Sequence, residues 1–301
     1  MAGKVVLSIQ SHVVFGYAGN TAAVFPLQRL GREVWAINTV EFSNHTGYGS
    51  WKGRVLGAEL ASELVSGLEE RGVLGRCEAV LSGYLGDEAS GRAIIDAVKK
   101  VKKENPNAIY CCDPVMGDTG RGFYVRPDIP AFFKDELLPL ADIVCPNQFE
   151  LEALTGISIK NVNDAIAAVN ILHAKGVSVV LVTSFRETEG KMSMIVSDKI
   201  NLYKITTPEL PLNSGVAGTG DMTSAVFLSR YLETGNIKKT LELCTASVFG
   251  ILEASYRAAV SAETNSFYNT DNNPHFELKI IDAQEELICP SHHFKAEKLY
   301  T

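Results

Sequence analysis

Short apolar runs of strand length alternate with amphipathic helical segments along most of this chain of 301 residues. A strand that is followed by a helix usually returns in parallel beside the first strand. The alternation therefore predicts an α/β fold, with a mostly parallel central sheet and helices on both faces. The predicted strands are 5–9, 33–39, 79–83, 107–112, 143–145 and 177–183, with an antiparallel hairpin over 192–196 and 200–205. The predicted helices are 20–30, 58–70, 88–103, 163–175, 222–233 and 237–258.

Some finer expectations concern the ends of these elements and the division of the chain. Asn20 is expected to cap the first helix, since asparagine is a favoured N-cap residue. The polar residues 260–275 are expected to form a surface loop, and the apolar run 278–281 a late strand. The length permits one large α/β domain or two modest ones, and no internal repeat divides the chain.

Composition narrows the class of protein. The chain is 46% hydrophobic and 21% charged with a net charge of −7, whereas a protein that binds nucleic acid would usually be basic. The basic run 99–103 is interpreted as the solvated end of a helix. No apolar stretch reaches the roughly 18–20 residues of a membrane span, and no secretory signal is visible. Six cysteines without a C-x-x-C pair predict free thiols in a reducing cytoplasm, not disulfides or a zinc site.

A glycine-rich turn, in the sequence GVAGTGDMTSA, stands directly before a predicted helix. Gly218 and Gly220 flank Thr219 and let the backbone gather consecutive N–H groups. The positive end of a helix over about 219–232 adds to the same point, which predicts an anion hole for a phosphoryl group. Because Thr219 is the expected N-cap, Asp221 is left for proton uptake. An ordinary capped helix is the alternative, since G-x-G motifs are common.

Carboxylates follow two of the predicted strands, at the edge where ligands bind in parallel sheets. Asp113 and Asp118 follow the strand 107–112, and oxygen ligands of this kind suit Mg²⁺. A turn in which aspartates bond to their own backbone is the alternative. Asn147 and Glu150 have the spacing of a helix capping box, and Glu150 could equally face Asp113 and bind a metal-bound water.

Polar side chains after the first two predicted strands could bind a small polar ligand. They belong to Ser11, His12, Asn44, His45, Thr46 and Tyr48. A partly aromatic pocket wall is expected from Phe15, Tyr17, Val40, Phe42 and Tyr84. The chain has no P-loop, no G-x-G-x-x-G and no G-x-S-x-G motif, so phosphoryl transfer would need another scaffold.

Six blocks of sequence make the chain similar to the pyridoxal kinases of the ribokinase-like superfamily. They are LSIQSHVVFGYAGNTAAVFPLQRLG, INTVEFSNHTGYGSWKG, LSGYLGD, CDPVMGD, PNQFELEALTG and VAGTGD. The first two are specific to the pyridoxal kinase branch, and the last three are shared across the superfamily. The resemblance implies one ribokinase-like three-layer α/β/α domain over 1–301 and a homodimer. It also implies ATP with Mg²⁺, and phosphorylation of the 5′-hydroxymethyl group of a B6 vitamer such as pyridoxal.

Position by position, the resemblance implies a role for several groups of residues. Asp221 is the base, and the transferred phosphoryl group is bound by Gly218, Thr219 and Gly220. The vitamer lies against Ser11, Val40, His45, Thr46 and Tyr84. The phosphates of Mg-ATP are served by Asp113, Asp118, Asn147, Glu150, Thr183 and Ser184, with Tyr124 on a flap. The adenine pocket is bordered by Leu212, Asn213 and Ser214.

One position departs from the family pattern. Cys145 stands where many relatives have threonine, at a backbone position linked to a monovalent cation. Activation by K⁺ or Na⁺ is therefore in doubt. The segment 187–210 matches the family poorly, so the adenine contacts are the least defined part of the resemblance.

The resemblance also suggests how the reaction proceeds. Asp221 accepts the proton of the vitamer hydroxyl as that oxygen attacks the γ-phosphorus of ATP. The helix dipole is expected to favour the ionised form of Asp221 and so make it a weak base. A positive φ is expected at Gly220. A hydroxymethylpyrimidine kinase and a vitamer-binding protein without turnover are the alternative functions.

Overall fold

The computed structural model describes residues 4–212, 216–263 and 277–299. Asn213, Ser214 and most of the predicted loop 260–275 lie outside these residues. The strands of the described part are β1 (Val5–Phe15), β2 (Glu33–Asn44), β3 (Gly53–Val55), β4 (Cys77–Ser82), β5 (Ile109–Cys112), β6 (Gly117–Asp118), β7 (Gly122–Phe123), β8 (Ile143–Val144), β9 (Val179–Phe185), β10 (Lys191–Ser197), β11 (Leu202–Pro208) and β12 (Glu297–Lys298).

Ten of these strands form one continuous sheet, in the order β12-β11-β10-β9-β8-β5-β4-β1-β2-β3. The central strands, from β9 through β8, β5, β4 and β1 to β2, are parallel. Antiparallel strands extend both edges, with β10, β11 and β12 on one side and β3 on the other. The remaining strands, β6 and β7, pair as a separate small hairpin. The prediction of a mostly parallel α/β sheet is confirmed.

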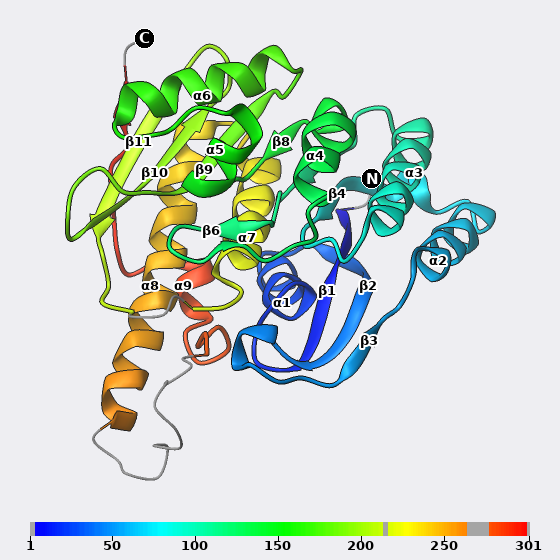
Figure 1. Cartoon of the computed structure of the whole chain (residues 1–301), viewed down its shortest axis with the longest axis horizontal. Helices are drawn as coiled ribbons and strands as arrows, with labels where there is room; N and C mark the ends of the chain where they lie inside the picture. Colours follow the sequence, from blue (N-terminus) through cyan, green and yellow to red (C-terminus); the bar gives the residue numbers. More distant parts are fainter. Residues whose placement is uncertain (1–3, 213–215, 264–276, 300–301) are drawn as a thin grey trace.

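Helices cover both faces of the sheet, which makes three layers (Figure 1). They are α1 (Asn20–Arg29), α2 (Ala58–Glu70), α3 (Glu88–Glu104), α4 (Ile129–Phe132), α5 (Gln148–Thr155), α6 (Val162–Ala174), α7 (Thr219–Thr234), α8 (Ile237–Glu263) and α9 (Glu285–Ile288). Short helical turns are η1 (Thr46–Tyr48), η2 (Leu74–Arg76), η3 (Phe133–Leu137) and η4 (Leu138–Leu140). In the described part, no helix is both long and apolar enough to cross a membrane.

Strand alternation divides the apolar side chains between two cores. Val5, Leu7 and Ile9 of β1 enter the core beneath α2, α3, α4, α5 and α6. Val6 points the other way, into the core beneath α1, α7 and α8. Successive side chains of a strand alternate between its faces, so a buried parallel strand must be apolar on both sides. This requirement explains the continuous apolar runs in the sequence.

Several predicted elements are confirmed closely. The predicted helix 58–70 is α2. The basic run lies in the last turns of α3, where Lys99 and Lys103 are exposed, Lys100 and Lys102 are half-buried and Val101 is buried. The predicted hairpin is β10 paired with β11, and the carboxylate of Asp198 accepts the backbone N–H groups of Ile200 and Asn201 in its turn. All six cysteines are free thiols, and Cys111 and Cys112 are both buried.

Other predictions were wrong at the ends of elements. The run 278–281 is not a strand, because Leu278 and Ile280 pack into the core under α7 and α8 from an irregular segment and a turn. Helix α8 continues to Glu263, so residues 260–263 belong to a helix. Asn20 does not cap α1: the N-cap is Gly19, and the Asn20 amide instead joins β1 to β2 by hydrogen bonds to Ser8 and the Ile37 carbonyl.

Candidate active site

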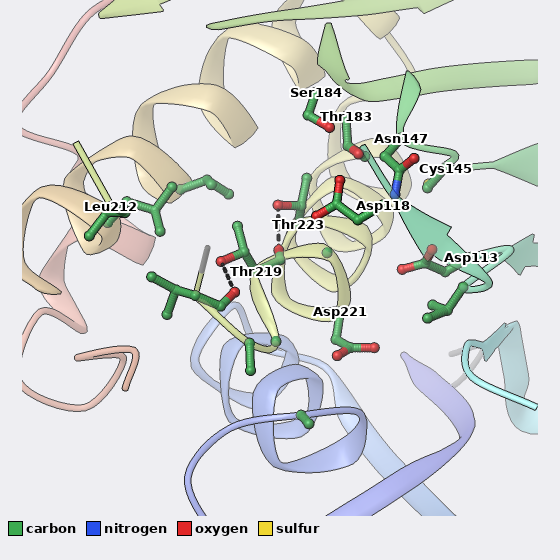
Figure 2. A pocket seen from close by; sticks show the side chains of 18 of the residues that line it. Asp113, Asp118, Cys145, Asn147, Thr183, Ser184, Leu212, Thr219, Asp221 and Thr223 are labelled. Atoms are coloured by element: carbon green, nitrogen blue, oxygen red, sulfur yellow. Dashed lines mark hydrogen bonds between the residues drawn. The ribbon is translucent and has the colours of Figure 1, made fainter. Parts of the chain in front are cut away.

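One cavity of about 630 Å³ opens at the carboxyl ends of the parallel strands, beside the start of α7. Every described residue to which the family resemblance gives a role lines this cavity. They are Ser11, Val40, His45, Thr46, Tyr84, Asp113, Asp118, Tyr124, Cys145, Asn147, Glu150, Thr183, Ser184, Leu212, Gly218, Thr219, Gly220 and Asp221. Asn213 and Ser214 lie outside the described residues. Figure 2 shows Asp118, Asn147 and Thr183 grouped on one side, Leu212 on the other, and Thr219 and Asp221 at the start of α7.

Other residues suggested for the same pocket do not line it. They are His12, Phe15, Tyr17, Asn44 and Tyr48. β1 runs six residues and β2 five residues further than predicted, so His12 is a strand residue. The pairing of β1 with β2 shifts in register between Gln10 and His12, and Ser11 lines the cavity whereas His12 does not. The His12 ring contacts the Glu41 carboxylate at 2.7 Å (Nδ1 to Oε1).

The glycine-rich turn forms the N-terminus of α7 and is open to the cavity. Gly218 is the N-cap and has φ 80°, and a Cβ there would lie 2.4 Å from the Tyr17 carbonyl oxygen. Two expectations were therefore wrong by one or two residues, because both the N-cap and the positive φ are at Gly218. Thr219 is not the N-cap but the first helical residue, and its hydroxyl donates to the Val216 carbonyl at 2.8 Å. The positive φ belongs to Gly218 and not to Gly220, where a Cβ would have room.

Asp221 lies in the first turn of α7 and is held by a hydrogen bond from outside the helix. Its Oδ2 accepts the backbone N–H of Gly19 at 2.8 Å. Burial raises the pKa of Asp221 above its ordinary value, and the Gly19 hydrogen bond offsets part of this rise. The expectation that the helix dipole would make Asp221 a weaker base than usual was therefore wrong, because desolvation outweighs the dipole here.

Asp113 is a buried carboxylate in the same cavity. Its Oδ2 accepts the hydroxyl of Ser224 at 2.7 Å, a contact between the end of β5 and α7, so its carboxylate is not used in a local turn. Burial and the negative charge of Asp221 raise the pKa of Asp113 from 3.8 to about 8, while the Ser224 hydroxyl acts in the opposite direction.

Glu150 caps the helix and also lines the cavity, while its binding of a metal-bound water stays a prediction. The capping box is present, since the Asn147 side chain accepts the Glu150 N–H and Glu150 Oε2 accepts the Asn147 N–H. The other oxygen, Oε1, accepts the Met116 N–H at 3.0 Å. The carboxylate still lines the cavity, and burial together with the charge of Asp113 raises its pKa well above its ordinary value.

The carboxylates of Asp113, Asp118 and Glu150 form a negatively charged corner of the cavity, which suits a divalent cation held through waters or phosphate oxygens. Asp113 and Glu150 are buried and repel each other, and the turn carboxylate of Asp118 accepts the Thr119 N–H at 2.7 Å. Among the described residues, no three carboxylate, imidazole or thiol groups lie close enough together to ligate an ion directly. The donor set therefore suits Mg²⁺ held through waters and phosphate oxygens, as is usual for this ion.

The opposite end of the cavity is built from β1, β2 and η1. His45 caps η1, and its Nδ1 accepts the N–H of Gly47. A carboxylate far away in sequence joins the two loops that shape this end: Glu277 accepts the Tyr17 N–H at 3.0 Å and the Tyr48 hydroxyl. Gly16 has φ 82°, which favours glycine, and a Cβ there would displace the Glu277 carboxylate.

The remaining wall is apolar, with a charged rim that sequence reasoning missed. Its apolar side chains are Met192, Met194, Leu212, Val248, Phe249 and Leu252. Arg121, Arg186 and Glu209 also line the cavity, and Arg186 Nε lies 2.8 Å from Glu209 Oε1. The available signal was the position of Arg186, directly after the strand that carries Thr183 and Ser184.

Cys145 is buried at the base of the cavity. Its Sγ lies 3.8 Å from Cys111 Sγ, and its backbone N–H donates to the Cys112 carbonyl at the end of the β5–β8 pairing. The wall here is thus built from two neighbouring parallel strands.

Comparison with known proteins extends over the whole chain. A family profile described as phosphomethylpyrimidine kinase matches residues 75–263. The pyridoxal kinase PdxY of Rubrobacter xylanophilus is 46% identical over 99% of this chain and 98% of its own length. The protein of the same name from Granulibacter bethesdensis is 46% identical over 97% of this chain and 99% of its own length.

Solved structures agree with these sequence matches. Pyridoxal kinase from Leishmania donovani in complex with ADP and pyridoxine superposes with a TM-score of 0.88 and is 30% identical, covering 99% of each chain. Plasmodium falciparum PdxK with AMP-PNP and PL has a TM-score of 0.82 at 25% identity, covering 100% of both chains. The present chain therefore has the ribokinase-like fold and belongs to the pyridoxal kinase family.

Proposed function

We propose that this chain transfers the γ-phosphoryl group of ATP to the 5′-hydroxymethyl group of pyridoxal, which gives pyridoxal 5′-phosphate in B6 salvage. The observation that carries the proposal is the position of Asp221. It stands at the open N-terminus of α7, in one cavity with the predicted vitamer residues and the predicted phosphate residues. Related structures hold ADP together with pyridoxine or pyridoxamine. Pyridoxine and pyridoxamine are further candidate substrates.

In the proposed step, the hydroxyl oxygen of the vitamer forms a bond to the γ-phosphorus as the bond to the β-γ bridging oxygen breaks and ADP leaves. Asp221 takes the hydroxyl proton. Its Oδ2 is engaged by Gly19, so we assign proton uptake to Oδ1. The N–H groups at Gly218, Thr219 and Gly220 stabilise the charge on the transferred group, and this positioning matters more than base strength in a loose transition state.

Asp113, Asp118 and Glu150 would hold Mg²⁺ through waters. When bound, the ion neutralises phosphate charge. Asn147, Thr183 and Ser184 position the phosphates, Tyr124 covers them, and the apolar wall with Leu212 to Ser214 borders the adenine. A monovalent cation, K⁺ or Na⁺, would use the backbone of Cys145. The Ser11, Val40, His45, Thr46 and Tyr84 side chains hold the vitamer.

The chain acts, in this proposal, as a cytoplasmic homodimer of one-domain subunits that binds neither nucleic acid nor membrane. The continuous sheet supports the single domain. Exposed apolar side chains gather on β1, the β2–β3 connection and β3, with Val14 74%, Phe15 58%, Trp51 47% and Val55 45% exposed. An apolar surface of this kind suits contact with a second copy.

A coupled assay of ADP release, with Mg-ATP and each vitamer in turn, tests the proposal. We expect turnover that depends on added pyridoxal, and a kcat lowered about 10²–10⁴-fold in Asp221→Ala with little change in the KM for ATP. Faster turnover with hydroxymethylpyrimidine would favour the alternative kinase. Vitamer binding without ADP release would favour a binding protein. An unchanged kcat in Asp221→Ala would remove that residue from the role.

A further inference from the structure

The charge of the cavity lining does not match the polyanion proposed to bind there. Five carboxylates line it: Asp113, Asp118, Glu150, Glu209 and Asp221. Among the described lining residues, the guanidinium groups are those of Arg121 and Arg186. A divalent cation would neutralise the carboxylates near Asp113. Binding of the nucleotide phosphates at the rim still requires positively charged side chains. Arg186 is the candidate because it lines the cavity and its guanidinium group pairs there with the carboxylate of Glu209.

Arg186 is placed by two neighbouring elements. It follows the last residue of β9, and its backbone N–H donates to the Gln148 side chain at 3.1 Å, at the start of α5. Thr183 and Ser184, which are predicted to contact the phosphates, lie just before it on the same strand. The base of the arginine is therefore fixed beside the proposed phosphate site.

The partner of Arg186 is Glu209, which follows β11. The pair crosses the start of β10, with Arg186 Nε 2.8 Å from Glu209 Oε1, while the Glu209 N–H donates to the Gly190 carbonyl at 2.9 Å. The side chains are 47% and 30% exposed. Ion pairs of this exposure contribute little to stability, so the guanidinium can exchange partners at small cost. A phosphate matches the planar fork of arginine as well as a carboxylate does, and it carries more charge.

We propose that Arg186 is a nucleotide-binding residue that leaves Glu209 to bind the α- or β-phosphate of ATP, and that Glu209 competes with the nucleotide for it. The inference rests on the nucleotide site of the proposed function. It assigns opposite effects to the two members of one ion pair. An ion pair that merely holds the ends of β9 and β11 together would give both members the same effect.

Isothermal titration of the full-length protein with Mg-ADP and with adenosine tests this assignment without any need for turnover. We expect Arg186→Gln to raise the Kd for Mg-ADP about 10-fold and to leave the Kd for adenosine within about 2-fold. Arg186→Lys, which keeps the charge and loses the fork, should fall between. Glu209→Gln should tighten Mg-ADP binding by about 2- to 3-fold, because it removes the competitor.

A neighbouring ion pair provides the matched control. Lys204 Nζ lies 3.0 Å from Glu187 Oε2, and neither residue lines the cavity. Lys204→Gln should leave both Kd values unchanged. The inference is overturned if Arg186→Gln and Glu209→Gln both weaken Mg-ADP binding, or if Arg186→Gln weakens adenosine as much as Mg-ADP. Absence of pyridoxal-dependent turnover in the wild-type protein would refute the proposed function but leave this binding result readable.

Discussion

Replacing Asp113 with asparagine should stabilise the ligand-free protein while it disables the reaction. The carboxyl group is buried, and its pKa rises from 3.8 to about 8. At about 1.4 kcal/mol for each pKa unit, that rise corresponds to roughly 5–6 kcal/mol of unfavourable free energy for the ionised form. Asparagine keeps the size of the side chain and an oxygen for the Ser224 hydroxyl, but it carries no charge.

The sign of the pH dependence follows from the raised pKa. Between about pH 4 and pH 8 the folded protein keeps a proton on Asp113 that the unfolded chain has released, so stability falls as the pH rises through this window. The Asp113→Asn variant lacks this dependence, because an amide does not titrate there. Part of the gain is lost with the charge-assisted hydrogen bond from Ser224, which is worth about 1 kcal/mol more than a neutral one. Relaxation around the buried charge removes more, and we expect about 2 kcal/mol at pH 8 and much less at pH 5.

Thermal unfolding of both proteins without nucleotide, at pH 5 and pH 8, measures the effect. A gain of about 2 kcal/mol in a chain of this length corresponds to a Tm increase of roughly 3 °C at pH 8. Turnover with Mg-ATP should fall sharply at the same time, since the variant weakens the proposed Mg²⁺ corner. A Tm of the variant that is equal to or below the wild-type value at pH 8, or a larger gain at pH 5 than at pH 8, would refute the reasoning.

Three more substitutions separate folding from binding. Gly218→Ala places a Cβ 2.4 Å from the Tyr17 carbonyl oxygen at a residue with positive φ, so the free energy of unfolding should fall by at least about 2 kcal/mol. An unchanged Tm in thermal unfolding would contradict this expectation. Gly220→Val should keep the Tm within about 2 °C and lower kcat/KM for ATP, because its side chain would enter the cavity and not the core. Glu277→Ala frees the Tyr17 and Tyr48 loops, so the KM for pyridoxal should rise about 5-fold in steady-state kinetics. An equal rise in the KM for ATP would mean a general loss of structure.

The layers and the site could be predicted from the sequence because both depend on local patterns. Apolar runs marked the buried strands, and polar residues after them marked the strand ends. The carboxyl ends of parallel strands share one edge of the sheet. The sequence therefore predicts that Asp113, Asn147 and Thr183 lie in one cavity, even when the strand order is not known. The strand order was not accessible in this way. That β8 lies between β5 and β9 depends on pairing between distant segments.

Local patterns failed where a tertiary contact decided the outcome. The apolar run of β1 stops at Ile9, yet the strand continues because β2 pairs with it beyond a register shift between Gln10 and His12. In this continuation Ser11 lines the cavity and His12 does not. Conversely, Leu278 and Ile280 alternate with more exposed neighbours as strand residues do, but they fill a gap against helices and have no partner strand.

The acidity of Asp221 shows how magnitudes decide between two valid arguments. A helix N-terminus stabilises a nearby carboxylate by about 0.3–1 kcal/mol when the site is exposed. Desolvation in the cavity acts in the opposite direction, and it prevails here because the pKa of Asp221 is raised and not lowered. The helix can be recognised in the sequence but the burial cannot, so sequence reasoning counts the dipole effect on the pKa and misses the desolvation. In the folded chain, Asp113, Glu150 and Asp221 share one poorly solvated cavity, and each is a stronger base than the sequence alone suggests. Binding of a cation with the nucleotide would release the protons that this cavity otherwise retains, so the same arrangement that weakens the empty protein prepares a base for the alcohol.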